Sequence, residues 1–119
     1  MKKIEALIRK EKFPDVDLAL KNIGVGGLTV LDAKGRGRSE LTVTYYARGK
    51  WSYTTDYINR VNVVIVVADA FVDKAVEAIL KSASTNSVGD GKIFISPLEN
   101  AIDIGTGEVD GCALESPPV

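Results

Sequence analysis

Residues 61–67 read Val-Asn-Val-Val-Ile-Val-Val, an almost continuous run of β-branched apolar side chains. Such a run is typical of a central strand that is covered on at least one face. The longest uninterrupted apolar run, residues 63–68, is far too short to span a bilayer. The residues after Met1 form no apolar signal-peptide core, so we expect no membrane insertion.

Three elements are predicted on the N-terminal side of this strand. Residues 3–8 alternate charged and apolar side chains and predict a strand. Pro14 and Asp15 open a helix that ends at Gly24, where a glycine cap is expected. The predicted apolar face of this helix comprises Val16, Leu18, Ala19, Leu20 and Ile23. Residues 28–33 are rich in branched side chains and predict a second strand.

The sequence on the C-terminal side of this strand predicts one helix and one strand. Asp69 is the expected N-cap of a helix whose apolar positions recur at helical spacing. A loop over residues 85–92 leads to a strand at 92–95, and we expect the chain beyond Pro97 to end in a disordered tail. The order βαββαβ predicts an α+β, ferredoxin-like domain, with two helices on one face of an antiparallel four-stranded sheet.

Composition limits the function classes. The 119 residues suit one domain, and the net charge of −1 argues against a nucleic-acid partner. The single cysteine, Cys112, fits a reducing compartment, so we expect a cytoplasmic protein. Histidine is absent, which excludes Ser-His and Cys-His pairs and the usual zinc sites. We therefore expect no catalytic residues, no metal site and no enzymatic activity.

Two short motifs combine glycines with cations. Residues 34–38 read Lys-Gly-Arg-Gly-Arg, and residues 88–92 read Val-Gly-Asp-Gly-Lys. Glycines allow backbone N–H groups to approach a ligand closely, and cations suit phosphate oxygens. Each motif is also compatible with a simpler structure, a solvated loop for the first and a plain turn for the second.

The segment between residues 37 and 56 has no helix or strand pattern. It carries Trp51 and several tyrosines beside Arg48 and Lys50, side chains that often anchor protein interfaces. Long loops in compact domains are usually functional, so we expect a partner-contacting loop. The alternative is that its aromatic residues extend the neighbouring strands into a hairpin.

Several segments together resemble the PII family of nitrogen and carbon regulators. They are residues 1–6, 27–30, 34–38, 76–80, 88–97 and 106–108. The resemblance covers residues 1–108, weakens within residues 37–56 and leaves residues 109–119 as a flexible tail. It implies a homotrimer with nucleotide sites between subunits, a B-loop at about 85–92, and a T-loop at about 37–56 that docks onto partners.

The resemblance also implies functional residues. Leu7 and Thr29 would border the adenine of a bound adenine nucleotide. The remaining nucleotide contacts would be Gly35, Arg36, Gly37 and Arg38, with Gly89, Asp90, Gly91 and Lys92 holding phosphates. Effector or T-loop contacts would come from Ser39, Arg48, Trp51, Tyr53 and Arg60.

The sequence departs from the family pattern at several positions that contact the ligand in the family. Ser39 stands at the glutamine that helps organise magnesium and 2-oxoglutarate, and Asp103 and Gly105 stand at two phosphate-binding arginines. Val64 replaces the adenine-reading glutamate, and Arg60 replaces a lysine near 2-oxoglutarate. These departures predict a divergent member that prefers ADP or AMP to the full assembly of ATP, magnesium and 2-oxoglutarate.

The target of such a protein is not specified by the sequence. An ammonium transporter, a bicarbonate transporter or a metabolic enzyme would each suit a PII relative. The competing interpretation is a trimeric adaptor that binds its partner without a ligand. An RNA-recognition domain shares the element order, but strand 61–67 lacks its stacking aromatics.

Overall fold

The computed structural model describes residues 1–36, 41–45, 51–55 and 57–111. Its strands and helices follow in the order β1 (Lys2–Arg9), η1 (Lys10–Lys12), α1 (Phe13–Asn22), β2 (Thr29–Gly35), β3 (Leu41–Tyr45), β4 (Trp51–Thr55), β5 (Ile58–Val67), η2 (Asp69–Phe71), α2 (Val72–Ala83) and β6 (Gly91–Pro97). The predicted strands and helices are confirmed, with boundaries that differ by a few residues.

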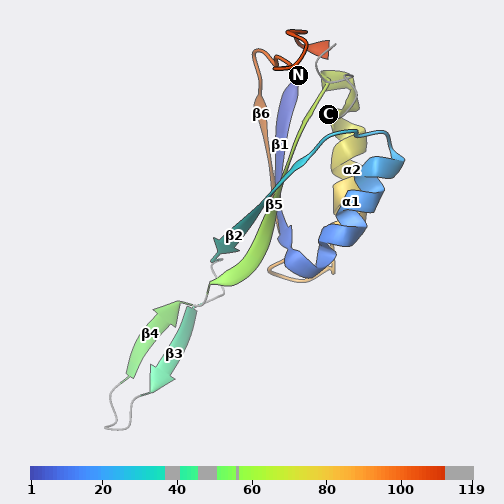
Figure 1. Ribbon diagram of the computed structural model, residues 1–119. Coiled ribbons are helices and arrows are strands. Elements are labelled where there is room, and N and C mark those ends of the chain that lie inside the picture. Colours follow the sequence, from blue (N-terminus) through green and yellow to red (C-terminus); the bar gives the residue numbers. More distant parts are fainter. Residues whose placement is uncertain (37–40, 46–50, 56, 112–119) are drawn as a thin grey trace.

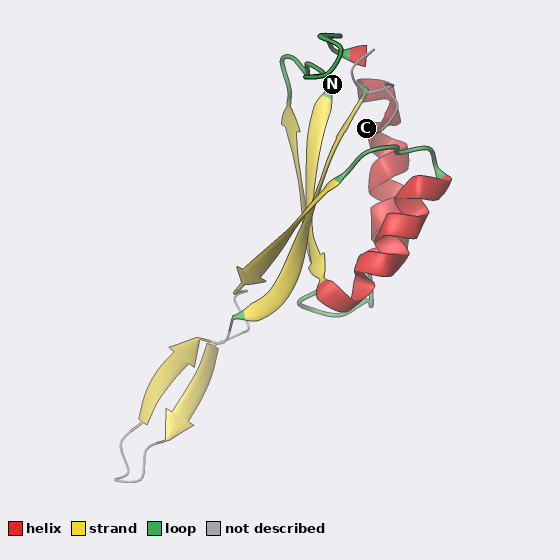
Figure 2. Cartoon of the chain, viewed as in Figure 1, coloured by secondary structure: helices red, strands yellow, loops and turns green. Residues whose placement is uncertain are grey.

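Four strands form one antiparallel sheet in the order β2-β5-β1-β6. Both α-helices lie on the same face of this sheet, and the opposite face has no helix over it (Figures 1 and 2). This arrangement confirms the ferredoxin-like fold. Strand β5, which contains the apolar run, has β2 on one side and β1 on the other, as a central strand requires.

The register of β5 against β1 decides which side chains face the helices. Ile4 lies opposite Ile65, and Ile8 lies opposite Val61. Because side chains alternate along a strand, the odd-numbered residues of β5 enter the core. The buried apolar residues are Ile4, Ala6, Ile8, Val16, Leu20, Val61, Val63, Ile65, Val67, Ala75, Ile79 and Ala83.

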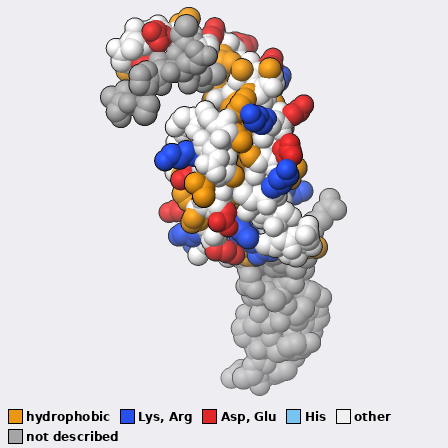
Figure 3. All heavy atoms as spheres, turned by 90° about the vertical axis from the view of Figure 1, so that its right-hand side faces the viewer, with side chains coloured by type: hydrophobic (Ala, Val, Ile, Leu, Met, Phe, Trp, Pro, Cys, Tyr) orange, Lys and Arg blue, Asp and Glu red, His pale blue; other side chains and the backbone are white. Residues whose placement is uncertain are grey.

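The helices bury narrower faces than the sequence predicts. Val16 and Leu20, four residues apart, are buried in α1, whereas Leu18 is 58% exposed. Leu80 of α2 is likewise exposed. Leu18 is two positions from both Val16 and Leu20, so it lies about 200° around the helix from each of them and points to solvent. In Figure 3 this helical surface carries charged side chains of both signs among isolated apolar ones.

The prediction that Asp69 caps the second helix is wrong. Residues Asp69–Phe71 form the short helix η2, and the N-cap position of α2 is Phe71, without a side-chain cap. The Asp69 carboxylate instead pairs with the amino group of Met1, with 2.9 Å between Oδ1 and N. This ion pair lowers the pKa of Asp69 from its ordinary value.

Within residues 37–56 the described parts form a hairpin, which is closer to the alternative interpretation than to an irregular loop. Strands β3 and β4 form a separate two-stranded sheet in which Leu41 lies opposite Thr55 and Tyr45 lies opposite Trp51. This hairpin projects from one end of the four-stranded sheet (Figure 1). The radius of gyration of 18.2 Å accordingly exceeds the value of about 13 Å expected for a compact domain of this length.

The chain after β6 is more structured than a loose tail. Ile102 and Val109 form an antiparallel bridge, and the Asp103 N–H donates to the Glu108 carbonyl at 2.8 Å. The Asp110 N–H donates to the Ala101 carbonyl at 2.7 Å. Residues 112–119, with Cys112, lie outside the described residues.

A substitution at Gly91, at the start of β6, would test how closely β6 packs against β1. Its φ is +119°, and an added Cβ would lie 1.8 Å from the Leu7 carbonyl oxygen. We expect Gly91→Ala to lower the free energy of unfolding by about 3 kcal/mol or more, measured by urea denaturation. Gly26→Ala is the matched control, because a Cβ at Gly26 meets nothing within 4 Å. Equal stability of the two variants would contradict this account of β6.

Candidate functional site

The two glycine-and-cation motifs meet at one end of the sheet. The first lies at the end of β2, which includes Lys34 and Gly35. The second spans the end of the 84–90 loop and the start of β6, because Gly91 and Lys92 already belong to the strand. Gly35 pairs with Ile58 at the root of the β3–β4 hairpin, and the Arg60 side chain lies near both Gly35 and Gly89, so the end of the sheet that carries the hairpin is the candidate site.

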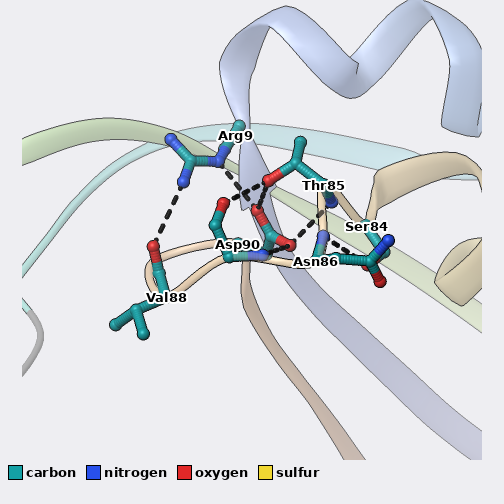
Figure 4. A network of polar contacts seen from close by, with 7 residues as sticks. Arg9, Ser84, Thr85, Asn86, Val88 and Asp90 are labelled. Carbon is teal, nitrogen blue, oxygen red and sulfur yellow. Dashed lines mark hydrogen bonds and ion pairs between the residues drawn. The ribbon is translucent and has the colours of Figure 1, made fainter.

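The 84–90 loop is organised around the carboxylate of Asp90 (Figure 4). The Thr85 N–H donates to Asp90 Oδ2 at 2.7 Å, and the Ser87 N–H donates to the same oxygen at 3.3 Å. The Thr85 hydroxyl donates to Oδ1. Arg9 Nε pairs with Oδ1 at 3.0 Å, and its Nη2 donates to the Val88 carbonyl at 3.3 Å. Arg9 therefore ties the loop to the end of β1.

These contacts hold the pKa of Asp90 far below its ordinary value. The largest cause is the hydrogen bond from the Thr85 hydroxyl, followed by the Thr85 N–H. The Arg9 guanidinium and the Ser87 N–H act in the same direction, and partial burial opposes them. Asp90 was expected among the phosphate-holding residues, but its charged carboxylate faces its own loop and Arg9.

Arg60 lies between the two glycine motifs. It is only 7% exposed, although it is charged. A Cβ built on Gly35 would lie 3.1 Å from both Cδ and Nε of Arg60, and one built on Gly89 would lie 3.9 Å from Arg60 Nη2 and 3.4 Å from Arg9 Nη2. Two guanidinium groups thus approach the backbone of Gly89, an arrangement that attracts anions.

The residues expected to border adenine lie on the face of the sheet opposite the helices. Leu7 is opposite Lys92 on β6 and Asn62 on β5. Thr29 is at the start of β2, so β5 separates it from β1. Two strand spacings are roughly 10 Å, and one chain therefore does not bring Leu7 and Thr29 into contact.

An open cavity of about 290 Å³ adjoins the root of the hairpin. Its lining comprises Lys10, Asp32, Ala33, Lys34, Asn59 and Arg60. Three cations and one carboxylate give this lining a positive balance. The cavity and the Gly89 backbone share Arg60, so this residue links two polar regions at the same end of the sheet.

Several residues of the predicted site cannot be placed. Gly37, Arg38, Ser39 and Arg48 lie outside the described residues. Trp51 and Tyr53 lie on β4, where the backbone alone is described. Among the described residues, no three Asp, Glu, Cys or His side chains gather in a group suited to a metal ion. None of the described helices has the length and apolarity that a membrane span requires.

Arg9 is the functional residue that sequence reasoning missed. No motif in the sequence includes it, and its partner Asp90 lies 81 residues further along the chain. The alternation of β1 placed Arg9 on the same face as Leu7, which was the available signal. Nothing local in the sequence indicates that this face meets the 84–90 loop.

Comparison with known proteins gives the family. The model of the family described as "Nitrogen regulatory protein P-II" matches residues 1–108. The chain belongs to the P-II family. Three relatives carry the same description. The protein of Azospirillum brasilense is 43% identical over 96% of this chain and its own full length. That of Rhodospirillum rubrum is 46% identical over the same shares. That of Cereibacter sphaeroides is 48% identical over 91% of this chain and 95% of its own length.

Family membership sets the general role within which the site is interpreted. P-II proteins are regulatory signal transducers, and a trimer is typical of the family. The resemblance inferred from short motifs is therefore confirmed over residues 1–108.

The network around Asp90 predicts a pH dependence of stability. Because the pKa of Asp90 is lower in the folded protein than the ordinary value of 3.8, its stabilising contribution is complete well above that value and is lost as the pH falls below it. We expect Asp90→Asn to be less stable than the parent at about pH 7, with a difference that shrinks at about pH 3. Urea unfolding followed by circular dichroism measures both.

Asp17→Asn, at an exposed position of α1, is the control and removes the same charge. A stability difference for Asp90→Asn that stayed constant with pH would contradict the role assigned to the Asp90 carboxylate.

Proposed function

We propose that this protein is a cytosolic regulator that binds an adenine nucleotide and reports the bound state to a partner protein, without a catalytic step. The observation that supports this most is the position of Arg60. Its side chain lies against Gly35, at the root of the projecting hairpin, and beside Gly89, in the second glycine-and-cation motif. A phosphate-binding region and a partner-binding element would then share one residue.

The chemistry of this end of the sheet suits phosphate groups. Arg9 and Arg60 approach the Gly89 backbone, and Lys92 follows on β6. Phosphate oxygens accept charge-assisted hydrogen bonds from guanidinium and ammonium groups, and glycine lets the backbone come close. Leu7, two residue pairs further along the sheet from Arg9 and Arg60, would border an adenine ring.

A nucleotide cleft between subunits requires an assembled trimer. The sheet face opposite the helices exposes apolar side chains, with Leu31 at 51% and Phe94 at 50%. Burial of this face against other copies would remove apolar surface from water. Leu7 and Thr29 do not meet within one chain. Contact between copies would therefore also be needed to complete the adenine site.

The segment after β6 supports a preference for ADP or AMP. Residues 98–111 contain four acidic residues and no lysine or arginine. Asp103 stands where family members carry a phosphate-binding arginine, and its Oδ1 accepts a hydrogen bond from the Thr106 N–H at 3.0 Å. The carboxylate thus stabilises its own turn. Each additional phosphate on a ligand would find fewer cations here than the family pattern supplies.

The hairpin is the proposed contact with the partner. It projects beyond the sheet (Figure 1), and its sequence includes Trp51, Tyr53 and Arg48, residue types that anchor interfaces. The partner would be an ammonium transporter, a bicarbonate transporter or a metabolic enzyme of nitrogen or carbon metabolism. The alternative is an adaptor that binds its partner without a ligand. The acidic residues of segment 98–111 favour this alternative, because they would weaken the binding of nucleotide phosphates.

Calorimetric titration tests this proposal. ATP, ADP and AMP are titrated separately, each with and without magnesium and 2-oxoglutarate. We expect ADP or AMP to bind more tightly than ATP with magnesium, and 2-oxoglutarate to have no effect. ATP binding strengthened by 2-oxoglutarate would overturn the proposed preference, and no binding of any nucleotide would favour the adaptor.

A charge-matched pair of variants locates the phosphate site. We expect Lys92→Met to weaken ADP binding about tenfold or more, because a hydrogen bond to a charged group contributes ~1.5–3 kcal/mol. Lys21→Met, which removes an exposed charge from the last turn of α1, should leave ADP affinity unchanged. Equal ADP affinity of the two variants would exclude Lys92 from the site.

A further inference from the structure

The centre of the open sheet face carries one uncharged polar side chain. This face is the one opposite the helices (Figures 1 and 2). Because side chains alternate along a strand, it takes the even-numbered residues of β5 and the odd-numbered residues of β1. Among the described residues of these two central strands, Asn62 is the only one on this face that is polar without a charge. Leu7 on β1 and Leu31 on β2 lie directly opposite it on either side.

The carbonyl oxygen of the Asn62 side chain lacks a hydrogen-bond partner. Oδ1 is buried and accepts no hydrogen bond from the described residues. The two leucine side chains beside it offer no donor. A buried polar group without a partner destabilises a protein, and almost all such groups in native structures find one. A partner for Asn62 is therefore expected from outside the single chain.

An amide is self-complementary, whereas a charged group is not. The Asn62 side chain carries an acceptor, Oδ1, and a donor group, Nδ2. Three identical amides around a threefold axis can close a ring in which each Nδ2 donates to the Oδ1 of the next copy. The torsion that turns an amide is soft, so Oδ1 can leave its buried position without a change in the backbone. Three identical charges in the same place would repel one another.

The position of Asn62 suits such an axis. A trimer is typical of the family, and the open face is the one that the proposed assembly buries. When three copies turn the same face inward, the centre of that face lies nearest to the axis. The charged groups on this face leave room for the contact. Glu5 pairs with Lys3, with 3.7 Å between Oε1 and Nζ, and Arg9 and Arg60 lie toward the hairpin end of the sheet.

We propose that the Asn62 amides of three copies hydrogen-bond to one another at the threefold axis and thereby select copies of this chain as partners. This inference rests on the interface in the proposed function, but it does not require a bound nucleotide. A chain with a charged side chain at this position would break the ring and place an unpaired charge among leucines. The amide therefore contributes to the choice of partner more than to the strength of the contact.

Two variants of opposite charge test this contact. We expect Asn62→Asp and Asn62→Lys, each alone, to raise the protein concentration at which the trimer dissociates about tenfold or more, because three like charges meet at the axis. An equimolar mixture of the two should assemble again, since opposite charges then meet. Sedimentation velocity over a dilution series measures each assembly, and an affinity tag on one variant shows whether it captures the other.

Asn22→Asp and Asn22→Lys are the matched controls. Asn22 is exposed at the end of α1, which lies over the other face of the sheet (Figure 1). Both control variants introduce the same charges as the Asn62 variants. We expect them to assemble as the parent does, alone and in the mixture.

The outcomes separate this inference from the proposed function. Assembly of both Asn62 variants as strong as that of the parent, or dissociation that the mixture does not reverse, overturns the amide contact. Neither result bears on ADP binding by the parent, which calorimetry measures separately. A parent that is monomeric overturns both the amide contact and the nucleotide cleft between subunits.

A crystal structure of the parent gives the decision if an Asn62 variant does not fold, as judged by circular dichroism. Asn62 side chains of different copies with Nδ2 and Oδ1 within about 3.2 Å support the contact. Asn62 side chains beyond hydrogen-bonding reach of one another overturn it.

Discussion

The structure depends on a single register, that of β5 between β1 and β2. In this register the odd-numbered residues of β5 face the helices, with Val61 opposite Ile8 and Ile65 opposite Ile4. A shift by one residue would turn Asn62 and Val64 toward the helices and expose the present core residues. Burial of the apolar half of β5 therefore also fixes which side chains reach the other face. Function and stability rest on the same alternation.

The same register creates the candidate site. It places Arg60 opposite Arg9 on one side and Ala33 on the other, at the end of the sheet where the hairpin begins. The glycines there allow close approach, since a side chain at Gly35 would compress Arg60 and one at Gly91 would overlap the Leu7 carbonyl. Arg60 thus lies close to Gly35 at the root of the hairpin and near Gly89 in the 84–90 loop.

Periodicity predicted most of the fold because alternation in strands and helical spacing are local properties. The ferredoxin-like arrangement, the central position of β5 and the cap at Gly24, with φ +98°, followed from the residues themselves. Interactions between distant segments did not follow. The ion pair of Arg9 with Asp90 and that of Met1 with Asp69 depend on the three-dimensional fold. The contacts of Asp90 with Thr85, Ser87 and Arg9 likewise could not be read from the motif at 88–92.

The hairpin was only the alternative interpretation of residues 37–56, for a different reason. The sequences of β3 and β4, Leu-Thr-Val-Thr-Tyr and Trp-Ser-Tyr-Thr-Thr, are rich in β-branched and aromatic residues, which favour strands. These two segments contain many polar residues and show no apolar face, so an irregular loop was the preferred interpretation. Two strands that pair with each other nevertheless satisfy their backbone hydrogen-bonding groups without a buried face. The hairpin joins the four-stranded sheet after Gly35 on one side and before Ile58 on the other. On the proposed function, Arg60 belongs both to the phosphate-binding region and to the root of the hairpin. Selection on ligand affinity at Arg60 would then also alter the signal, so discrimination among nucleotides and communication with the partner would not evolve independently.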